Sequence, residues 1–291
     1  MNTLLIVGAN GFIGKIFCEN FINKKLKKWN ITEITLISNK FDKLNKFKNC
    51  KNIKFIKSNL KDIKILKNYT NVIYAIRSSS YKEDKLVFSN FCTLAIKYLK
   101  NAKISYMSSG SVYGPNLIKN KIKENQEINT SRYNIYKNYK NIYSKIKFAN
   151  EKKLIKLSNS IKCISILRCF SFVGKNLLNE NDYLLSALHN NKKKLFLNKN
   201  TYRSYMNEKD LLNWILTINF FNKKFNIFNV GSDKYYSMVE VVKFFSLLKK
   251  INCNVEFVND KIDFYIPNTS KAKFFFNLKH VSDLKKNLSR C

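Results

Sequence analysis

The chain has 291 residues, of which 45% are hydrophobic and 14% aromatic, so it can bury a sizeable core. With only 7 Gly and 2 Pro, it is neither collagen-like nor built on Pro/Gly-rich linkers. The formal net charge of +35 raises nucleic-acid binding as a function, but only five of the 54 basic residues are arginine, and the lysines are scattered along the whole chain. AT-biased codon usage explains this composition, so we interpret the charge as a solvated basic surface and keep nucleic-acid binding as a minor alternative.

Several other classes of protein are disfavoured. The seven Cys include no CxxC pair, and His189 and His280 are far apart, so neither a disulfide framework nor a metal site is indicated. The first apolar run lacks a preceding basic region and stops at Gly8, which is not the pattern of a signal peptide. The longest apolar stretch, Leu211–Phe221, contains two asparagines and is too short to span a bilayer. The sequence therefore predicts no membrane association and a reducing, cytoplasmic setting.

Short apolar runs alternate with longer helical patterns. The first strand is predicted at Leu4–Val7, and a helix with Ile13, Ile16 and Phe17 on one face follows it. Further strands are predicted at Ile34–Ile37, Ile53–Ile56, Val72–Ile76, Ile104–Met107, Ile164–Leu167 and Asn226–Val230, with helices at Leu86–Leu99 and Tyr143–Leu157. This alternation predicts an α/β fold, a parallel sheet covered by helices on both faces, with a smaller lobe in the less regular region after Phe170.

Three of the glycines form one motif directly after the first strand. Gly8 permits a tight turn, Gly11 lets the backbone approach a pyrophosphate, and Gly14 allows the helix to pack closely. The helix N-terminus then offers free N–H groups and a partial positive charge to phosphates. The motif therefore predicts a dinucleotide-binding turn.

The form Gly-x-x-Gly-Phe-Ile-Gly resembles the extended short-chain dehydrogenase/reductases, the NAD(P)-dependent epimerase/dehydratase group. Similar segments recur in order at 108–114, 143–151, 166–174, 203–211, 228–232 and 270–272. The resemblance implies a Rossmann-like, doubly wound sheet in residues 1–168, to which 203–232 return. It implies a smaller substrate-binding lobe in residues 169–202 and 233–291, and it allows for a homodimer.

The family's catalytic trio corresponds to Ser109, Tyr143 and Lys147. Several Tyr-x-x-x-Lys pairs occur in this Tyr- and Lys-rich chain, and competing ones start at Tyr81, Tyr133 and Tyr136. We favour Tyr143 because its pair opens a helical stretch that also carries the family's glutamate, Glu151. The i, i+4 spacing stacks the ammonium near the phenol, where it stabilises the phenolate form. Tyr143 is thus expected to act as general acid/base and Ser109 to hydrogen-bond the reacting oxygen.

The cofactor implied by the resemblance is NAD(P). The residues expected to bind it are Gly8, Gly11, Phe12, Ile13, Gly14, Ser38, Asn39, Lys40, Asn59, Leu60, Arg77, Tyr143, Lys147 and Phe170. The family's acid after the second strand, which binds the adenosine ribose, is replaced by the run Ser38-Asn39-Lys40. A neutral or basic residue suits a 2′-phosphate better than a 2′-hydroxyl, so the sequence mildly favours NADP. Asn59 likewise replaces the usual acid after the third strand.

The expected substrate is a nucleotide sugar, bound by Ser109, Ser171 and Arg203. The Asp-Glu pair of sugar 4,6-dehydratases is absent, since Gly110 and Ser111 follow Ser109. This pattern favours 4-epimerisation or 4-ketone reduction over dehydration. Because Arg77 replaces a small residue beside the cofactor and Ser171 replaces an asparagine, a catalytically impaired dinucleotide-binding module with a regulatory or scaffolding role stays as an alternative.

Overall fold

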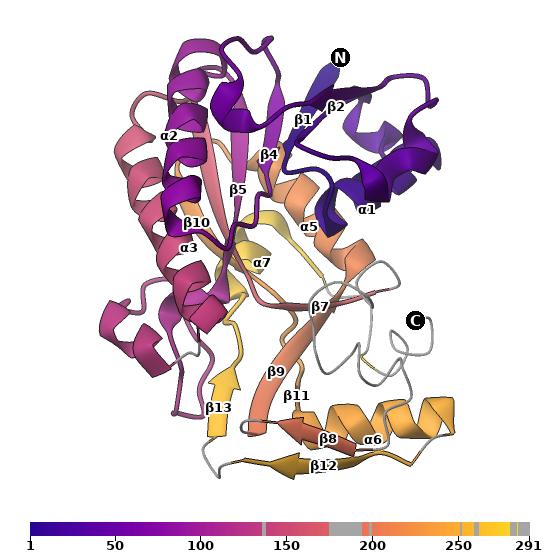
Figure 1. Ribbon diagram of the computed structural model, residues 1–291, viewed down its shortest axis with the longest axis vertical. Helices are drawn as coiled ribbons and strands as arrows, with labels where there is room; N and C mark the ends of the chain where they lie inside the picture. Colours follow the sequence, from indigo (N-terminus) through magenta and orange to yellow (C-terminus); the bar gives the residue numbers. More distant parts are fainter. Residues whose placement is uncertain are drawn as a thin grey trace.

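The computed structural model describes residues 1–135, 138–174, 194–197, 200–250, 252–258, 262–279 and 284. Its main body is a seven-stranded parallel sheet with the order β10-β6-β5-β4-β1-β2-β3 (Figure 1). The strands are β1 (Asn2–Val7), β2 (Ile31–Ser38), β3 (Ile53–Lys57), β4 (Asn71–Tyr74), β5 (Lys103–Ser109), β6 (Cys163–Cys169) and β10 (Asn226–Val230). The predicted Rossmann-like α/β fold is confirmed, and each of the seven predicted strands has a counterpart in this sheet.

Helices cover both faces of the sheet. Helices α1 (Phe12–Ile22), α5 (Glu208–Phe221) and α7 (Ser270–Phe276) pack on one face, and α2 (Tyr81–Tyr98) and α3 (Asn138–Leu157) pack on the other. Leu4 and Ile6 of β1 belong to the first core, whereas Leu5 and Val7 belong to the second. Because both faces are buried, β1 is a continuous apolar run rather than an alternating one.

Two small sheets lie outside the main sheet in the described part of the chain. Strands β7 (Ser171–Val173), β9 (Asn200–Asn207), β11 (Tyr235–Ser237) and β13 (Ile262–Tyr265) form one, and β8 (Lys194–Leu197) pairs with β12 (Asn254–Phe257) in the other. Helix α6 (Met238–Lys249) begins with a capping box in which Ser237 and Glu240 bond each other's backbone N–H. Among the described helices, none has the length and apolar character needed to cross a bilayer.

Several predicted boundaries differ from the structure, and three of these differences lie next to the candidate site or its helices. Strand β4 ends at Tyr74, so Ile76 lies in the loop that follows it. Helix α2 begins at Tyr81 rather than Leu86, because the Ser80 side chain caps it by accepting the Glu83 N–H. Helix α3 begins at Asn138, so Tyr143 lies inside it instead of opening it.

The strand order reverses at β1. This strand pairs with β2 on one side and with β4 on the other, so the chain winds away from it in both directions. In open α/β sheets, ligands bind beyond the carboxyl ends of the strands at such a point. The glycine motif 8–14 follows β1 there, so a ligand site is expected at this edge of the sheet.

Candidate active site

The glycine loop has a different packing constraint at each glycine. Gly8 has a φ of +81°, and a Cβ there would lie 2.7 Å from the Ile76 backbone. A Cβ on Gly14 would lie 1.8 Å from the Ala9 carbonyl oxygen. A Cβ on Gly11, the N-cap of α1, would meet only the Gly8 oxygen, at 4.0 Å. The space beside Gly11 is thus open, as the approach of a pyrophosphate requires.

A hollow of about 330 Å³ lies beside this loop, at the ends of the first four strands. Five of the remaining residues predicted to bind the cofactor line it, namely Ser38, Asn39, Asn59, Leu60 and Arg77. Two of the predicted cofactor residues line no described hollow. Lys40 is exposed outside it, and Gly14 packs against the loop backbone instead.

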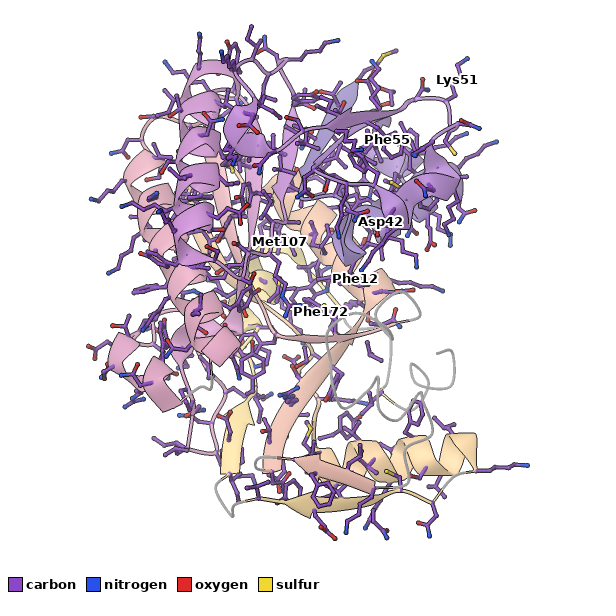
Figure 2. The ribbon with its side chains drawn as sticks, viewed as in Figure 1. Phe12, Asp42, Lys51, Phe55, Met107 and Phe172 are labelled. Atoms are coloured by element: carbon purple, nitrogen blue, oxygen red, sulfur yellow. The ribbon has the colours of Figure 1, made fainter. Side chains whose placement is uncertain are left out.

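A second hollow of about 470 Å³ shares Gly8, Gly11 and Arg77 with the first, so the two adjoin at the glycine loop. The structure brings all three predicted catalytic residues, Ser109, Tyr143 and Lys147, to its wall. The remaining predicted cofactor and substrate residues also line it, namely Phe12, Ile13, Phe170, Ser171 and Arg203. Phe12, Met107 and Phe172, which are labelled in Figure 2, line this hollow. The ring centroids of Phe12 and Phe172 lie 6.3 Å apart in a stacked arrangement.

Lys147 is the buried cation of the site. Its ammonium donates to the carbonyls of Met107 at 2.8 Å and Ile76 at 3.0 Å and lies 5.7 Å from the centre of the Tyr143 ring. Burial lowers the pKa of Lys147 to about 8, and the nearby Asp84 carboxylate opposes that shift. The site therefore holds an ammonium group that loses its proton at a lower pH than an ordinary lysine does.

The structure separates the competing Tyr-x-x-x-Lys pairs. Tyr143 lines the hollow, and the Arg77 guanidinium lies 5.6 Å from its ring centre. Tyr133 is buried elsewhere and donates its hydroxyl hydrogen to the Val112 carbonyl. Tyr81 is half-exposed at the start of α2 and lines neither hollow. Tyr136 lies outside the described residues, as do His189 and His280.

The model of the NAD-dependent epimerase/dehydratase family matches residues 4–231. The chain belongs to this family. No curated protein matches the chain.

Solved structures share the fold at low sequence identity. A dTDP-glucose 4,6-dehydratase from Bacillus anthracis, in complex with NAD, is 17% identical with a TM-score of 0.80, over 100% of this chain and 95% of that one. A UDP-glucose 4-epimerase from Thermotoga maritima, with UDP-glucose, is 16% identical with a TM-score of 0.76, over 99% and 96%. A UDP-glucuronic acid 4-epimerase variant from Bacillus cereus, with NAD and a fluorinated UDP-sugar, is 16% identical with a TM-score of 0.79, over 99% and 97%.

One departure of this epimerase/dehydratase family member from the dehydratase sequence pattern has a steric correlate. A Cβ on Gly110 would lie 2.7 Å from the Phe170 ring, which is itself buried against Tyr113 and Tyr265. An acidic side chain at position 110 would therefore have to displace that ring. The position of the Phe170 ring therefore requires a residue without a Cβ at position 110.

Several residues that line the second hollow were not predicted from the sequence, and one of them, Tyr265, is in contact with Phe170. It lies at the end of β13, lines the second hollow, and its ring packs 4.6 Å from Phe170. Burial raises the pKa of Tyr265, while a hydrogen bond with Ser109 and the positive charge of Arg203 oppose that rise. Tyr265 lies in the region whose pattern is least regular, so no periodicity or spacing pointed to it.

The four-stranded sheet of β7, β9, β11 and β13 brings two predicted substrate residues, Ser171 and Arg203, to the second hollow. Ser171 begins β7 and Arg203 lies in β9, and these two strands pair in parallel with Ser171 opposite Tyr205. The hollow is thus walled by the main sheet on one side and by β7, β9 and β13 on the other. A ligand there would contact both parts of the chain.

Proposed function

We propose that this chain is an NAD(P)-dependent oxidoreductase of nucleotide sugars that acts as a 4-epimerase or a 4-ketoreductase. The observation that carries the proposal is that the second hollow reaches from the open face of Gly11 to Ser109, Tyr143 and Lys147, while the first hollow adjoins it at the glycine loop. Its solved neighbours include enzymes in complex with NAD, UDP-glucose and a UDP-glucuronic acid derivative, which supports this class of ligand.

Each residue of the trio has a proposed role. Tyr143 exchanges a proton with the sugar hydroxyl or ketone, and Ser109 hydrogen-bonds the same oxygen. Lys147 keeps a positive charge near the phenol, and its third N–H is assigned to the cofactor's ribose. A bound nicotinamide supplies the hydride acceptor or donor at the sugar carbon.

The substrate's anionic part is assigned to Arg203, with Ser171 beside it. Arg203 lines the same hollow as the trio, and its planar guanidinium suits a phosphate better than an ammonium does. For the cofactor we propose a mild preference for NADP, which rests on the absence of an acid at Ser38 and Asn39. Lys40 adds little to this preference, because it lies outside the hollow.

Calorimetric titration with NAD and NADP, followed by incubation with UDP-glucose, UDP-galactose and 4-keto sugar nucleotides, tests the proposal. We expect dinucleotide binding and conversion of at least one sugar nucleotide, detected by mass spectrometry. Cofactor binding without any turnover would favour the impaired-module alternative. The absence of binding to either dinucleotide would rule out the proposed function.

A further inference from the structure

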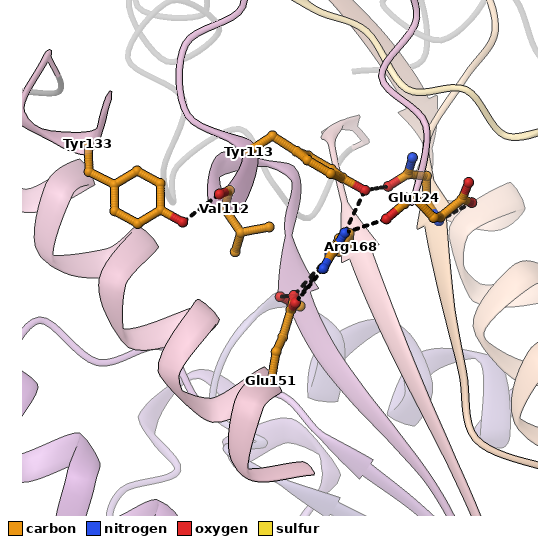
Figure 3. A network of polar contacts seen from close by, with 8 residues as sticks. Val112, Tyr113, Glu124, Tyr133, Glu151 and Arg168 are labelled. Carbon is orange, nitrogen blue, oxygen red and sulfur yellow. Dashed lines mark hydrogen bonds and ion pairs between the residues drawn. The ribbon is translucent and has the colours of Figure 1, made fainter. Parts of the chain in front are cut away.

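A buried ion pair lies directly behind the proposed catalytic residues. Glu151 of α3 is 0% exposed and Arg168 of β6 is 4% exposed. Arg168 Nη2 donates to Glu151 Oε2 at 2.7 Å, and Nε donates to both carboxylate oxygens at 3.2 Å (Figure 3). The proposed chemistry uses neither side chain, so this fully buried pair needs its own explanation.

The pair holds the chain on both sides of Ser109. Just before it, Ser108 Oγ donates to Glu151 Oε1. Just after it, in the turn Gly110–Tyr113, the Tyr113 hydroxyl accepts from Arg168 Nη1 at 2.9 Å and donates to Asn229 at 2.8 Å. Arg168 Nη1 also donates to the Glu124 carbonyl at 3.1 Å. Ser109 thus lies between Ser108, which is bonded to the Glu151 carboxylate, and Tyr113, which is bonded to the Arg168 guanidinium.

The same pair also holds helix α3. Lys147 lies one turn before Glu151 and Tyr143 two turns before it, so the three side chains share one helix face. Lys147 bonds the Met107 carbonyl, and the next residue of the strand, Ser108, bonds Glu151. Ser108 and Arg168 are direct partners in the β5–β6 register, so Glu151 joins the helix to both strands at one level.

The energetics indicate what such a pair contributes. A buried ion pair gains little net stability over apolar residues of the same volume, because both charges lose their hydration. A network in which every member is hydrogen-bonded does fix the relative positions of its members. We infer that Glu151 and Arg168, through Ser108 and Tyr113, are positioning residues that set Ser109 against Tyr143 and Lys147. This inference rests on the roles proposed above for that trio.

Two serines of β5 form a matched pair for the test. Ser108 is 3% exposed and bonds Glu151, whereas Ser105 is 0% exposed and accepts from Asn219 Nδ2 at 2.9 Å, nearer the other end of the strand. Ser108→Ala and Ser105→Ala each remove one buried hydroxyl, and both should lower the urea midpoint. Only Ser108→Ala should lower kcat, by roughly tenfold to a hundredfold, because a small misplacement of reacting groups has that effect. KM should change by no more than about twofold, since the Ser108 hydroxyl, although Ser108 lines the second hollow, donates its hydrogen to Glu151.

A second readout needs neither substrate nor cofactor. NMR titration of isotope-labelled lysine follows Lys147, whose signal is assigned with Lys147→Arg. The charged and titratable groups that act on Lys147 are Asp84 of α2, Cys169 of β6, Glu151 of α3 and Arg77 after β4. The Glu151 carboxylate raises the pKa of Lys147, so Glu151→Gln should lower the titration midpoint of Lys147. Ser108→Ala should alter the Lys147 resonance, and Ser105→Ala should leave it unchanged.

The outcomes separate this inference from the proposed function. If Ser108→Ala and Ser105→Ala lose stability alike and match in both kcat and the Lys147 resonance, the network only stabilises the fold and the inference is overturned. If the wild-type protein turns over no sugar nucleotide, the proposed function fails while the Lys147 titrations still decide whether the network positions that side chain. Glu151→Gln leaves Arg168 buried without its partner charge, so Ser108→Ala carries the test if that variant does not fold.

Discussion

Tyr143 and Tyr133 begin the same sequence pattern but have opposite surroundings. Tyr143 lines the hollow beside Lys147, whereas the Tyr133 hydroxyl is bonded to the Val112 carbonyl away from it. Tyr143→Phe should lower kcat by roughly 10²–10⁴-fold with cofactor affinity nearly unchanged, because the lost hydroxyl serves proton transfer. Tyr133→Phe, the control, should lower stability and leave kcat close to wild type. Full activity of Tyr143→Phe would remove this residue from the mechanism.

Gly11 separates cofactor binding from folding. The protein itself leaves room for a side chain there, and φ is −90°, which any residue adopts. Gly11→Val should therefore fold with a near-wild-type melting temperature, yet lose most NAD(P) affinity in calorimetry, because the side chain fills the pyrophosphate approach. Gly14→Ala is the contrasting variant, since its Cβ would clash with the Ala9 carbonyl and should destabilise the protein. Unchanged affinity in Gly11→Val would contradict the cofactor assignment.

Lys147 gives the proposed activity a pH limit. Its pKa of about 8 lies below the ordinary lysine value, so a function that needs the ammonium falls as pH rises through about 8. The Asp84 carboxylate raises this pKa, so Asp84→Asn should move the alkaline fall of kcat/KM to lower pH. Glu33→Gln, which removes an acid paired with Lys54 outside both hollows, is the control and should leave the profile unchanged. Coincident profiles for Asp84→Asn and wild type would show that another group sets the limit.

At the scale of elements, strand β9 of the four-stranded sheet places the guanidinium-bearing residue Arg203 at the second hollow. Arg203 lies in this strand and lines the same hollow as Ser109 of β5 and Tyr143 and Lys147 of α3. Arg203→Leu should raise KM for a sugar nucleotide about tenfold or more while the Kd for NAD(P) stays within about twofold, because a charge-assisted bond to the substrate is lost. Steady-state kinetics measures the KM for the sugar nucleotide, and calorimetry measures the Kd for NAD(P). An equal loss of cofactor affinity would assign Arg203 to the dinucleotide instead.

At the scale of the whole molecule, the charge is the dominant feature. Lys and Arg number 54 against 19 Asp and Glu, so the folded chain repels itself. Raising salt from about 0.05 M to about 0.5 M shortens the screening length and should raise the melting temperature. Sodium and potassium chloride should act alike if screening is the cause. A melting temperature that falls or stays constant would show that self-repulsion does not limit stability.

Local signals in the sequence determined most of the main sheet and the glycine loop. A strand buried on both faces must be a continuous apolar run, and a turn that needs a positive φ selects Gly8, so both features can be read along the chain. The ends of the helices did not follow from the apolar pattern, because a capping residue such as Ser80 extends a helix beyond its apolar residues. The family resemblance rested on the same contiguous segments.

Only the tertiary structure decided how distant residues combine. It placed Tyr133 in the core and Tyr143 in the hollow, although both begin the same pattern. It brought Tyr265 against Ser109 and left Lys40 outside the hollow. The physical reason is that burial, charge pairing and hydrogen bonding depend on contacts between segments far apart in the chain, which no local spacing encodes.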